Sequence, residues 1–268
     1  MAGDRMRAKS PRFFTIAMAA LGTVLLLFVI LPVLSTIFST SPAMLAKTAV
    51  DSEVLNSILL TFYSAALATM IAAIVGVPLA YLLARHEFPG RSVVEGIVDI
   101  PVVMPHTAAG IALLMVFGRQ GLLGRGLSRV GMVFTGSVGG IVVAMLFVSM
   151  PFMVDASKEA FRGVDPRLEN VARTLGASPT RVFFKVTLPL AWRGILAGAV
   201  MMWARGISEF GSVVILTYHP MIAPVLVYDR FETFGLKYVL PVASLLILTS
   251  LAVFVLLRAL LRRPGEAA

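Results

Sequence analysis

Long apolar stretches alternate with short polar segments along almost the whole chain. The apolar stretches cover about residues 13–38, 56–84, 97–117, 133–154, 190–216 and 238–257. A helix of roughly 20 residues spans the hydrocarbon core of a bilayer, which is about 30 Å thick. Each stretch is long enough for this. The pattern therefore predicts an all-α integral membrane protein with six transmembrane helices.

The third apolar stretch contains Pro101 and Pro105. Proline inside a helix removes a backbone hydrogen bond and clashes with the preceding turn. We therefore expect this helix to be kinked or broken, at a place where neighbouring protein or water can satisfy the freed carbonyl groups.

Composition agrees with a membrane protein and excludes several other classes. Of 268 residues, 58% are hydrophobic and only 14% are charged, and the mean hydropathy is +0.92. Soluble domains have about a quarter of their residues charged. There is no cysteine, no P-loop pattern and no spaced pair of histidines. We therefore expect no thiol chemistry, metal site or cofactor on this chain, no enzymatic activity, and one transmembrane domain over residues 1–268.

The basic residues indicate the orientation. With six crossings, both termini lie on one side and the loops divide into two sets. Most Lys and Arg residues fall in the set that contains the two termini and the segment between the fourth and fifth apolar stretches. The positive-inside rule places that set in the cytoplasm. The excess of Lys and Arg on the cytoplasmic side thus accounts for the net charge of +9, and we expect no nucleic-acid partner.

The cytoplasmic segment over about residues 157–189 is predicted to form a helix, a bend and a second helix. Asp165 and Pro166 suit the N-cap and the first helical position, and Ser178 and Pro179 repeat that signal. Gly176 can adopt the positive φ that ends a helix. The first helix has one apolar stripe, made of Leu168, Val171, Ala172 and Leu175. Such a helix can dock a soluble partner, or pack on its own bundle or the lipid interface.

This segment resembles the cytoplasmic loop of prokaryotic ABC-importer permeases. The family pattern is E-A-A, three residues, G, nine residues, I, one residue, L-P. The matching positions here are Asn170, Val171, Ala172, Gly176, Val186, Leu188 and Pro189. Asn170, Val171 and Val186 depart from the pattern, and Glu169 could supply the carboxylate that Asn170 lacks.

The resemblance implies a set of partners. In the family the loop is a coupling helix, seated in a groove of a separate ATPase subunit that carries ATP and Mg²⁺. It implies two such ATPase subunits, a second copy of this chain around a central pathway, an extracytoplasmic substrate-binding protein and the cell membrane. The residues that it assigns to ATPase coupling are Arg167, Glu169, Asn170, Arg173, Gly176, Ala177 and Ser178.

Three further segments resemble oxyanion permeases. Residues 203–211 contain A-R-x-x-x-E-F-G, which recurs in sulfate, molybdate and tungstate permeases. Residues 99–107 and 218–224 look most like archaeal molybdate/tungstate permeases. The resemblance covers nearly all of residues 13–260 and implies a molybdate/tungstate importer. Sulfate or thiosulfate is the alternative substrate. A channel or secondary transporter, which would need no ATPase, is the alternative of another class.

Two charges stand within the fifth apolar stretch. Arg205 and Glu209 have the i, i+4 spacing of helix neighbours, and charges inside a membrane helix usually face a cavity or a partner. They either neutralise each other and orient the helix, or line the translocation path. On the second interpretation the path or gate residues are Arg205, Ser208, Glu209, Phe210 and His106. The alternative for His106 is a structural histidine held by a hydrogen bond.

The loop before the fourth stretch carries arginines on the predicted outer side. Arg119, Arg125 and Arg129 are either solvated beside lipid headgroups or contact acidic residues of a substrate-binding protein.

Overall fold

The structure is a computed structural model that describes residues 12–261, and within that range it contains helices and no strands. The helices are α1 (Arg12–Phe38), α2 (Pro42–Ala49), α3 (Ser52–Arg85), α4 (Arg91–Val103), α5 (His106–Phe117), α6 (Gly124–Arg129), α7 (Val138–Arg162), α8 (Pro166–Thr174), α9 (Pro179–Val182), the π-helical segment η1 (Phe183–Thr187), α10 (Leu188–Ile207), α11 (Gly211–Leu216), α12 (Ala223–Phe234) and α13 (Leu236–Leu261). Several of the Lys and Arg residues near the termini, on which the predicted orientation depends, lie outside the described residues. These are Arg5, Arg7, Lys9, Arg262 and Arg263.

Five helical segments are long and apolar enough to cross a membrane: α1, α3, α7, the continuous run from α9 through α10, and α13. The third predicted span is instead two helices, α4 and α5, bent by 115°. The chain leaves α4 through an extended Met104, the conformation that the following Pro105 favours. The predicted break is confirmed, and the pair is a sixth span only when both arms are counted together.

The fifth span ends earlier than predicted. Helix α10 stops at Ile207 rather than at Leu216, so Glu209 lies outside it, in the break before α11. The Glu209 carboxylate explains the break, because its Oε1 accepts hydrogen bonds from the backbone nitrogen and the hydroxyl of Ser212, at 2.9 and 2.8 Å. A side chain that satisfies the start of the next helix competes with continuation of the previous one.

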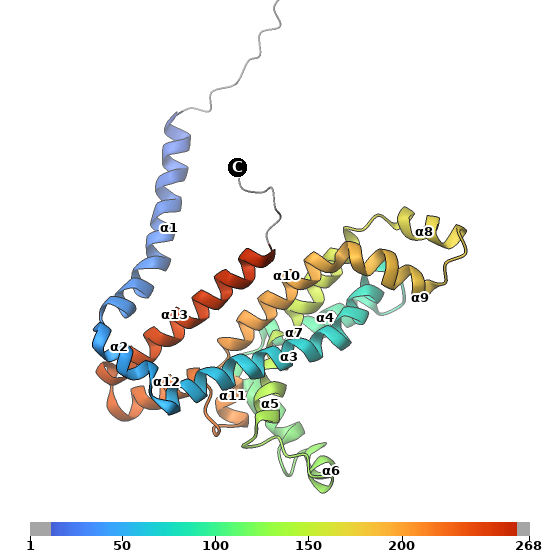
Figure 1. Ribbon diagram of the computed structural model, residues 1–268. Coiled ribbons are helices and arrows are strands. Elements are labelled where there is room, and N and C mark those ends of the chain that lie inside the picture. Colours follow the sequence, from blue (N-terminus) through green and yellow to red (C-terminus); the bar gives the residue numbers. More distant parts are fainter. Residues whose placement is uncertain (1–11, 262–268) are drawn as a thin grey trace, which may run out of the picture.

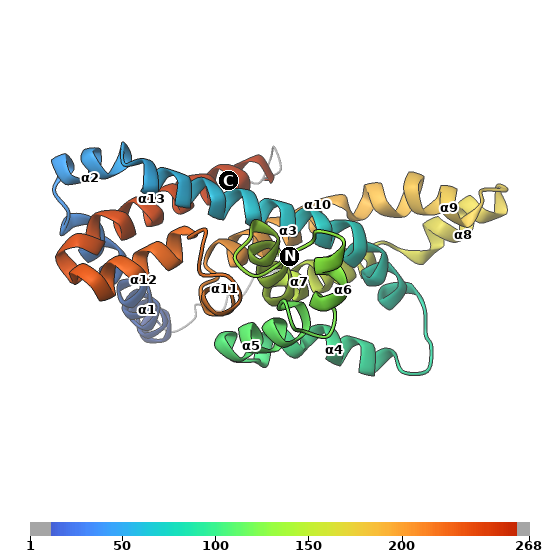
Figure 2. The same cartoon turned by 90° about the horizontal axis from the view of Figure 1, so that it is seen from below.

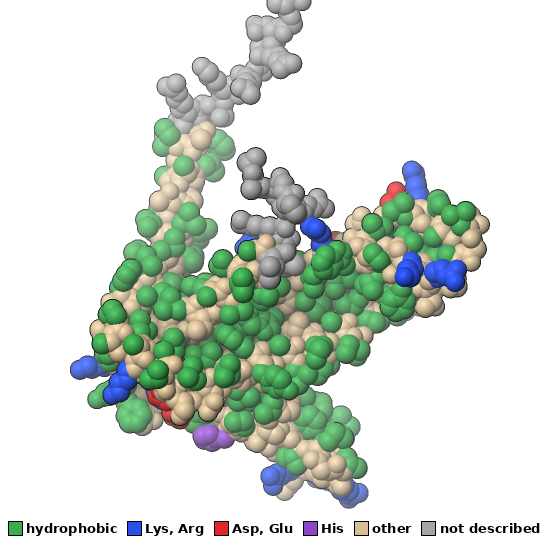
Figure 3. All heavy atoms as spheres, in the orientation of Figure 1, with side chains coloured by type: hydrophobic (Ala, Val, Ile, Leu, Met, Phe, Trp, Pro, Cys, Tyr) green, Lys and Arg blue, Asp and Glu red, His purple; other side chains and the backbone are tan. Residues whose placement is uncertain are grey.

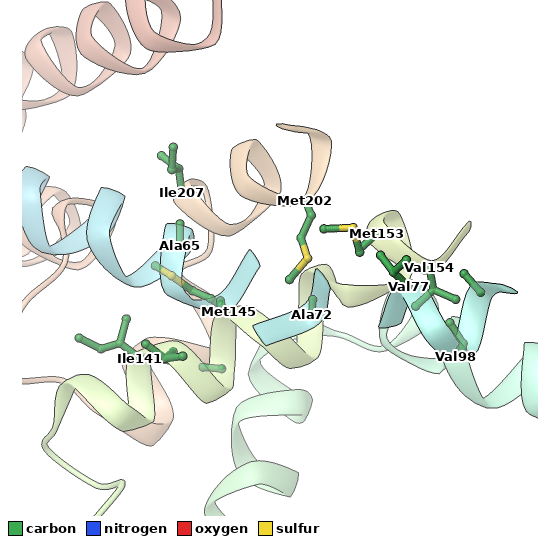
Figure 4. Close-up of a cluster of buried hydrophobic side chains, with 14 of the residues drawn as sticks. Ala65, Ala72, Val77, Val98, Ile141, Met145, Met153, Val154, Met202 and Ile207 are labelled. Carbon is green, nitrogen blue, oxygen red and sulfur yellow. The ribbon is translucent and has the colours of Figure 1, made fainter. Parts of the chain in front are cut away.

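The core lies where α3, α7 and α10 meet. Figure 4 shows Met145 of α7 close to Ala65 of α3, and Met202 of α10 between Ala72 of α3 and Met153 of α7. All five are almost completely buried. Flexible methionine side chains fill irregular gaps well, and the alanines allow the helix backbones to approach closely.

Two glycines allow α10 to pack tightly against α7. A Cβ atom on Gly194 would lie 2.5 Å from the Cβ of Ala160, and one on Gly198 would lie 2.7 Å from the Cβ of Ala156. We expect Gly194→Ala to lower the free energy of unfolding by about 1–3 kcal/mol, because the added methyl group overpacks the contact. The compensating pair Gly194→Ala with Ala160→Gly should recover most of the loss in thermal unfolding. An unchanged thermal unfolding midpoint for Gly194→Ala alone would show that α7 and α10 can move apart without loss of stability.

The molecule has projections at opposite ends. Figure 1 shows α8 and α9 at one end, on the same side as the first residues of α1 and the last residues of α13, whereas α6 projects on the other side. Figure 2 shows the same arrangement from below, with α8 and α9 beyond the end of the bundle. Figure 3 shows a mainly hydrophobic surface, with Lys and Arg side chains gathered near α8 and α9 and near α6. An apolar surface between two basic ends suits a protein embedded in a bilayer.

Candidate functional site

The predicted helix, bend and helix are confirmed in geometry. The Asp165 carboxylate accepts from the Arg167 nitrogen at 2.9 Å and begins α8, and Ser178 accepts from the Arg181 nitrogen at 3.4 Å and begins α9. Between them Gly176 has a φ of +85°. The nitrogens of Gly176 and Ala177 donate to the carbonyls of Arg173 and Ala172. These two bonds form a Schellman motif, which needs a positive φ at its glycine.

The apolar stripe of α8 faces away from the bundle. Leu168, Val171 and Leu175 are 48%, 57% and 83% exposed, and the polar candidates Arg167, Asn170, Arg173 and Ser178 are exposed with them. Packing of this stripe on the chain's own bundle is therefore excluded, which leaves a soluble partner or the lipid interface. An apolar stripe left uncovered on a short helix is typical of a surface that another protein covers.

Glu169 points in the opposite direction. It is the buried residue of α8, and its Oε1 accepts from Arg85 Nε at 2.8 Å and from Thr187 Oγ1 at 3.0 Å. The expectation that Glu169 offers a carboxylate at the surface is therefore not met. Arg85 and Thr187 were not among the predicted site residues. No local pattern marks them, because Arg85 is 84 positions away in the sequence.

A second polar cluster joins the break after α10 to the start of α5. Glu209 Oε2 lies 2.8 Å from His106 Nδ1 and 3.0 Å from Arg205 Nη2. The exposed fractions of the Glu209, Arg205 and His106 side chains are 1%, 22% and 42%. The sequence placed these three residues in one functional set, and the structure brings them into direct contact.

One histidine tautomer satisfies this cluster. If Nδ1 of His106 carries the proton, it donates to Glu209, and the free Nε2 is the acceptor for Arg205 Nη2, which lies 2.9 Å from Nε2 and 2.8 Å from Nδ1. The imidazole then contacts both charged groups, which also contact each other at 3.0 Å.

Ser208 and Phe210 flank the cluster but differ in their contacts. The Ser208 hydroxyl accepts from Arg205 Nη1 at 3.2 Å, so it belongs to the polar group. It also lines a mainly apolar cavity of about 510 Å³ between α1, α10, α12 and α13. The Phe210 ring instead packs on Tyr228 of α12, with the ring centroids 5.0 Å apart. Ser212, which the sequence did not single out, completes the Glu209 contacts.

Neither cluster has the composition of a metal centre. Over residues 12–261, no three His, Asp or Glu side chains gather in a way that could hold a metal ion.

The comparisons with known proteins give the family. A family model described as the inner membrane component of binding-protein-dependent transport systems matches residues 76–265. The chain belongs to this family.

Two relatives of this transport component show how far the likeness extends. The chain is 42% identical over 250 residues to the molybdate/tungstate transport system permease protein of Thermococcus kodakarensis, covering 92% of this chain and 96% of the relative. It is 31% identical over 264 residues to a probable sulfate transport system permease protein of Zygnema circumcarinatum, covering 94% and 91%.

A solved structure supports the fold of this transport component. The chain aligns with a chain of a bacterial alginate ABC transporter in complex with an alginate pentasaccharide-bound periplasmic protein. The TM-score is 0.74, the identity 15%, and the alignment covers 98% of this chain and 99% of the other. At this identity the likeness concerns the fold alone.

Proposed function

We propose that this chain is the permease subunit of an ATP-driven importer for molybdate and tungstate. Two copies would enclose the translocation pathway, which opens to each side of the membrane in turn. Membership of the transport family and 42% identity to a molybdate/tungstate permease support the proposal. The fifth-span segment 203–211 matches the oxyanion permease pattern.

The observation that best supports the proposal is the exposed apolar stripe of α8. A subunit that uses ATP must transmit its motion through a surface, and this chain presents Leu168, Val171 and Leu175 at one end of the bundle. Arg167, Asn170, Arg173, Gly176, Ala177 and Ser178 would line the same contact. ATP and Mg²⁺ would bind to the ATPase subunit and not to this chain, which would have no enzymatic activity of its own.

The orientation follows from the same surface. The end that carries α8, the start of α1 and the end of α13 would face the cytoplasm of the cell, in agreement with the positive-inside rule. The opposite end, with Arg119, Arg125 and Arg129 around α6, would face the substrate-binding protein. Selection of the anion would rest largely with that protein.

The mechanism needs only two arrangements of the pathway. Closure of the ATPase dimer would bring the two α8 helices together, and binding energy would favour one arrangement over the other by a few kcal/mol. The His106, Arg205 and Glu209 cluster would lie near the gate, because it joins the start of α5 to the break after α10.

Reconstitution tests the proposal. Liposomes that contain the permease and its ATPase, with the binding protein outside and ATP inside, should take up labelled molybdate. Uptake should stop when the ATPase is left out. Excess tungstate should compete with molybdate, whereas excess sulfate should compete only weakly. Strong competition by sulfate or thiosulfate would favour the alternative substrate. Uptake without the ATPase would identify a channel or secondary transporter.

A further inference from the structure

One buried carboxylate connects the docking helix to the membrane bundle. Glu169 of α8 accepts from Arg85 Nε, at the end of α3, and from Thr187 Oγ1, at the end of η1. The second arm of the Arg85 guanidinium donates from Nη2 to the carbonyl of Val164, in the link between α7 and α8, at 2.7 Å. Two separate parts of the chain, α3 and η1, therefore meet on one side chain of α8, and Arg85 also binds the link between α7 and α8.

Little else of α8 is held by the bundle. Glu169 is the only buried residue of this helix, and its apolar side chains point outward. The side chains of Arg85 and Glu169 are 10% and 6% exposed, so water screens their attraction only weakly. Charge-assisted hydrogen bonds in such surroundings are short and strong. Apart from the chain links to α7 and α9, the buried side-chain contact between α8 and the bundle is therefore the one made by Glu169.

Thr187 lies at an interruption of the regular helical hydrogen bonding, directly before α10. It ends the π-helical turn Phe183–Thr187, directly before the helix that contains Pro189. A proline ring clashes with the carbonyl four residues earlier in an α-helix, and the wider π turn relieves that clash. The regular hydrogen bonding is thus interrupted at the point where Glu169 is attached.

We propose that Arg85, Glu169 and Thr187 form a joint that transmits the displacement of α8 to α3 and α10. Glu169 is then a positioning residue for energy coupling and not a contact with the ATPase. Arg205 lies 18 residues beyond Thr187 along α10, about 27 Å for a helix, so a shift at the joint is carried to the His106, Arg205 and Glu209 cluster. This inference rests on the proposed function, in which an ATPase moves α8.

The first experiment measures molybdate taken up per ATP hydrolysed. Glu169→Gln keeps the shape of the side chain but removes the charge, and Thr187→Val removes the hydroxyl. We expect Glu169→Gln to lower the ratio about tenfold, since a charged hydrogen bond of this kind is worth at least that factor. Association with the ATPase should be unchanged. The matched control is Glu159→Gln, which removes an exposed carboxylate of α7 that pairs with Arg162.

A double variant separates transmission from stability. Arg85→Met with Glu169→Met removes both buried charges together and leaves only the half-exposed Arg173 without its Glu169 partner, so it should fold even where a single variant does not. It should also remain uncoupled. Normal uptake per ATP in this folded double variant would overturn the proposal that these residues transmit the displacement of α8.

The second experiment follows motion directly. The chain has no cysteine, so spin labels attach only where a cysteine is introduced. Thr174→Cys reports on α8 and Met201→Cys on α10, through the distance between the two copies. Nucleotide trapping should change both distances in the parent chain, but only the α8 distance in Glu169→Gln. Equal changes at both positions in Glu169→Gln would refute the joint. A parent assembly without ATP-dependent uptake would instead refute the proposed function.

Discussion

Replacing Glu209 with alanine is expected to lower the free energy of unfolding by about 3 kcal/mol, the usual result of breaking a buried ion pair from one side. The Glu209 side chain is 1% exposed and accepts from the nitrogen and hydroxyl of Ser212 while contacting Arg205 and His106. Without it, the Arg205 cation loses its partner inside a span. Thermal unfolding in detergent measures the effect, and Glu232→Gln on the exposed side of α12 is the control.

Milder variants separate the two interpretations of this cluster. Glu209→Gln keeps the hydrogen bonding to Ser212 but removes the charge, and Arg205→Met removes the cation. If the cluster belongs to the gate, both should alter ATP-driven uptake. The pair Arg205→Met with Glu209→Met should then recover stability but not uptake. Recovery of both would indicate that the two charges only orient the helix. Normal uptake in both single variants would remove the gate role.

The elements that follow from local chemistry could be predicted from the sequence. The spans follow from length and apolar content, and the break in the third span follows from Pro105. The bend after α8 follows from Asp165, Gly176 and Ser178, since a cap or a positive φ depends on the residue itself and its near neighbours. These signals act over a few residues.

The direction of α8 could not be predicted, because helical periodicity says which residues share a face but not what covers that face. In α8 the apolar face is uncovered and a carboxylate faces the protein. The compensating groups, Arg85 and Thr187, come from elements separated in sequence. The resemblance indicated that this helix is a coupling surface, but not that Glu169 is turned inward.

The end of α10 was missed for a related reason. Arg205 and Glu209 have helical spacing, yet the chain leaves the helix between them. The Glu209 carboxylate binds Ser212, three positions later, at this exit, and it also binds His106, 103 positions earlier. A pattern within one segment contains no information about such a partner.

Gly176→Val is expected to uncouple ATP hydrolysis from transport while leaving the spans inserted. The φ of +85° at this residue costs an ordinary side chain about 1–2 kcal/mol, and a β-branched one more. Within this chain a Cβ atom on Gly176 would meet nothing within 4 Å, so the strain that the substitution adds to the chain comes from the backbone and not from a steric clash. The substitution would favour a different bend between α8 and α9 and would misdirect the exposed stripe relative to Ser178.

A graded series tests this backbone origin. Asn visits the left-handed region readily, so Gly176→Asn should retain most of the uptake per ATP, with Gly176→Ala intermediate and Gly176→Val lowest. Gly163 is the matched control, because it ends α7 with a φ of −68° and also has room for a side chain. Gly163→Ala should therefore be nearly neutral. Equal uptake per ATP across the Gly176 series would show that the backbone conformation at this position does not matter for coupling.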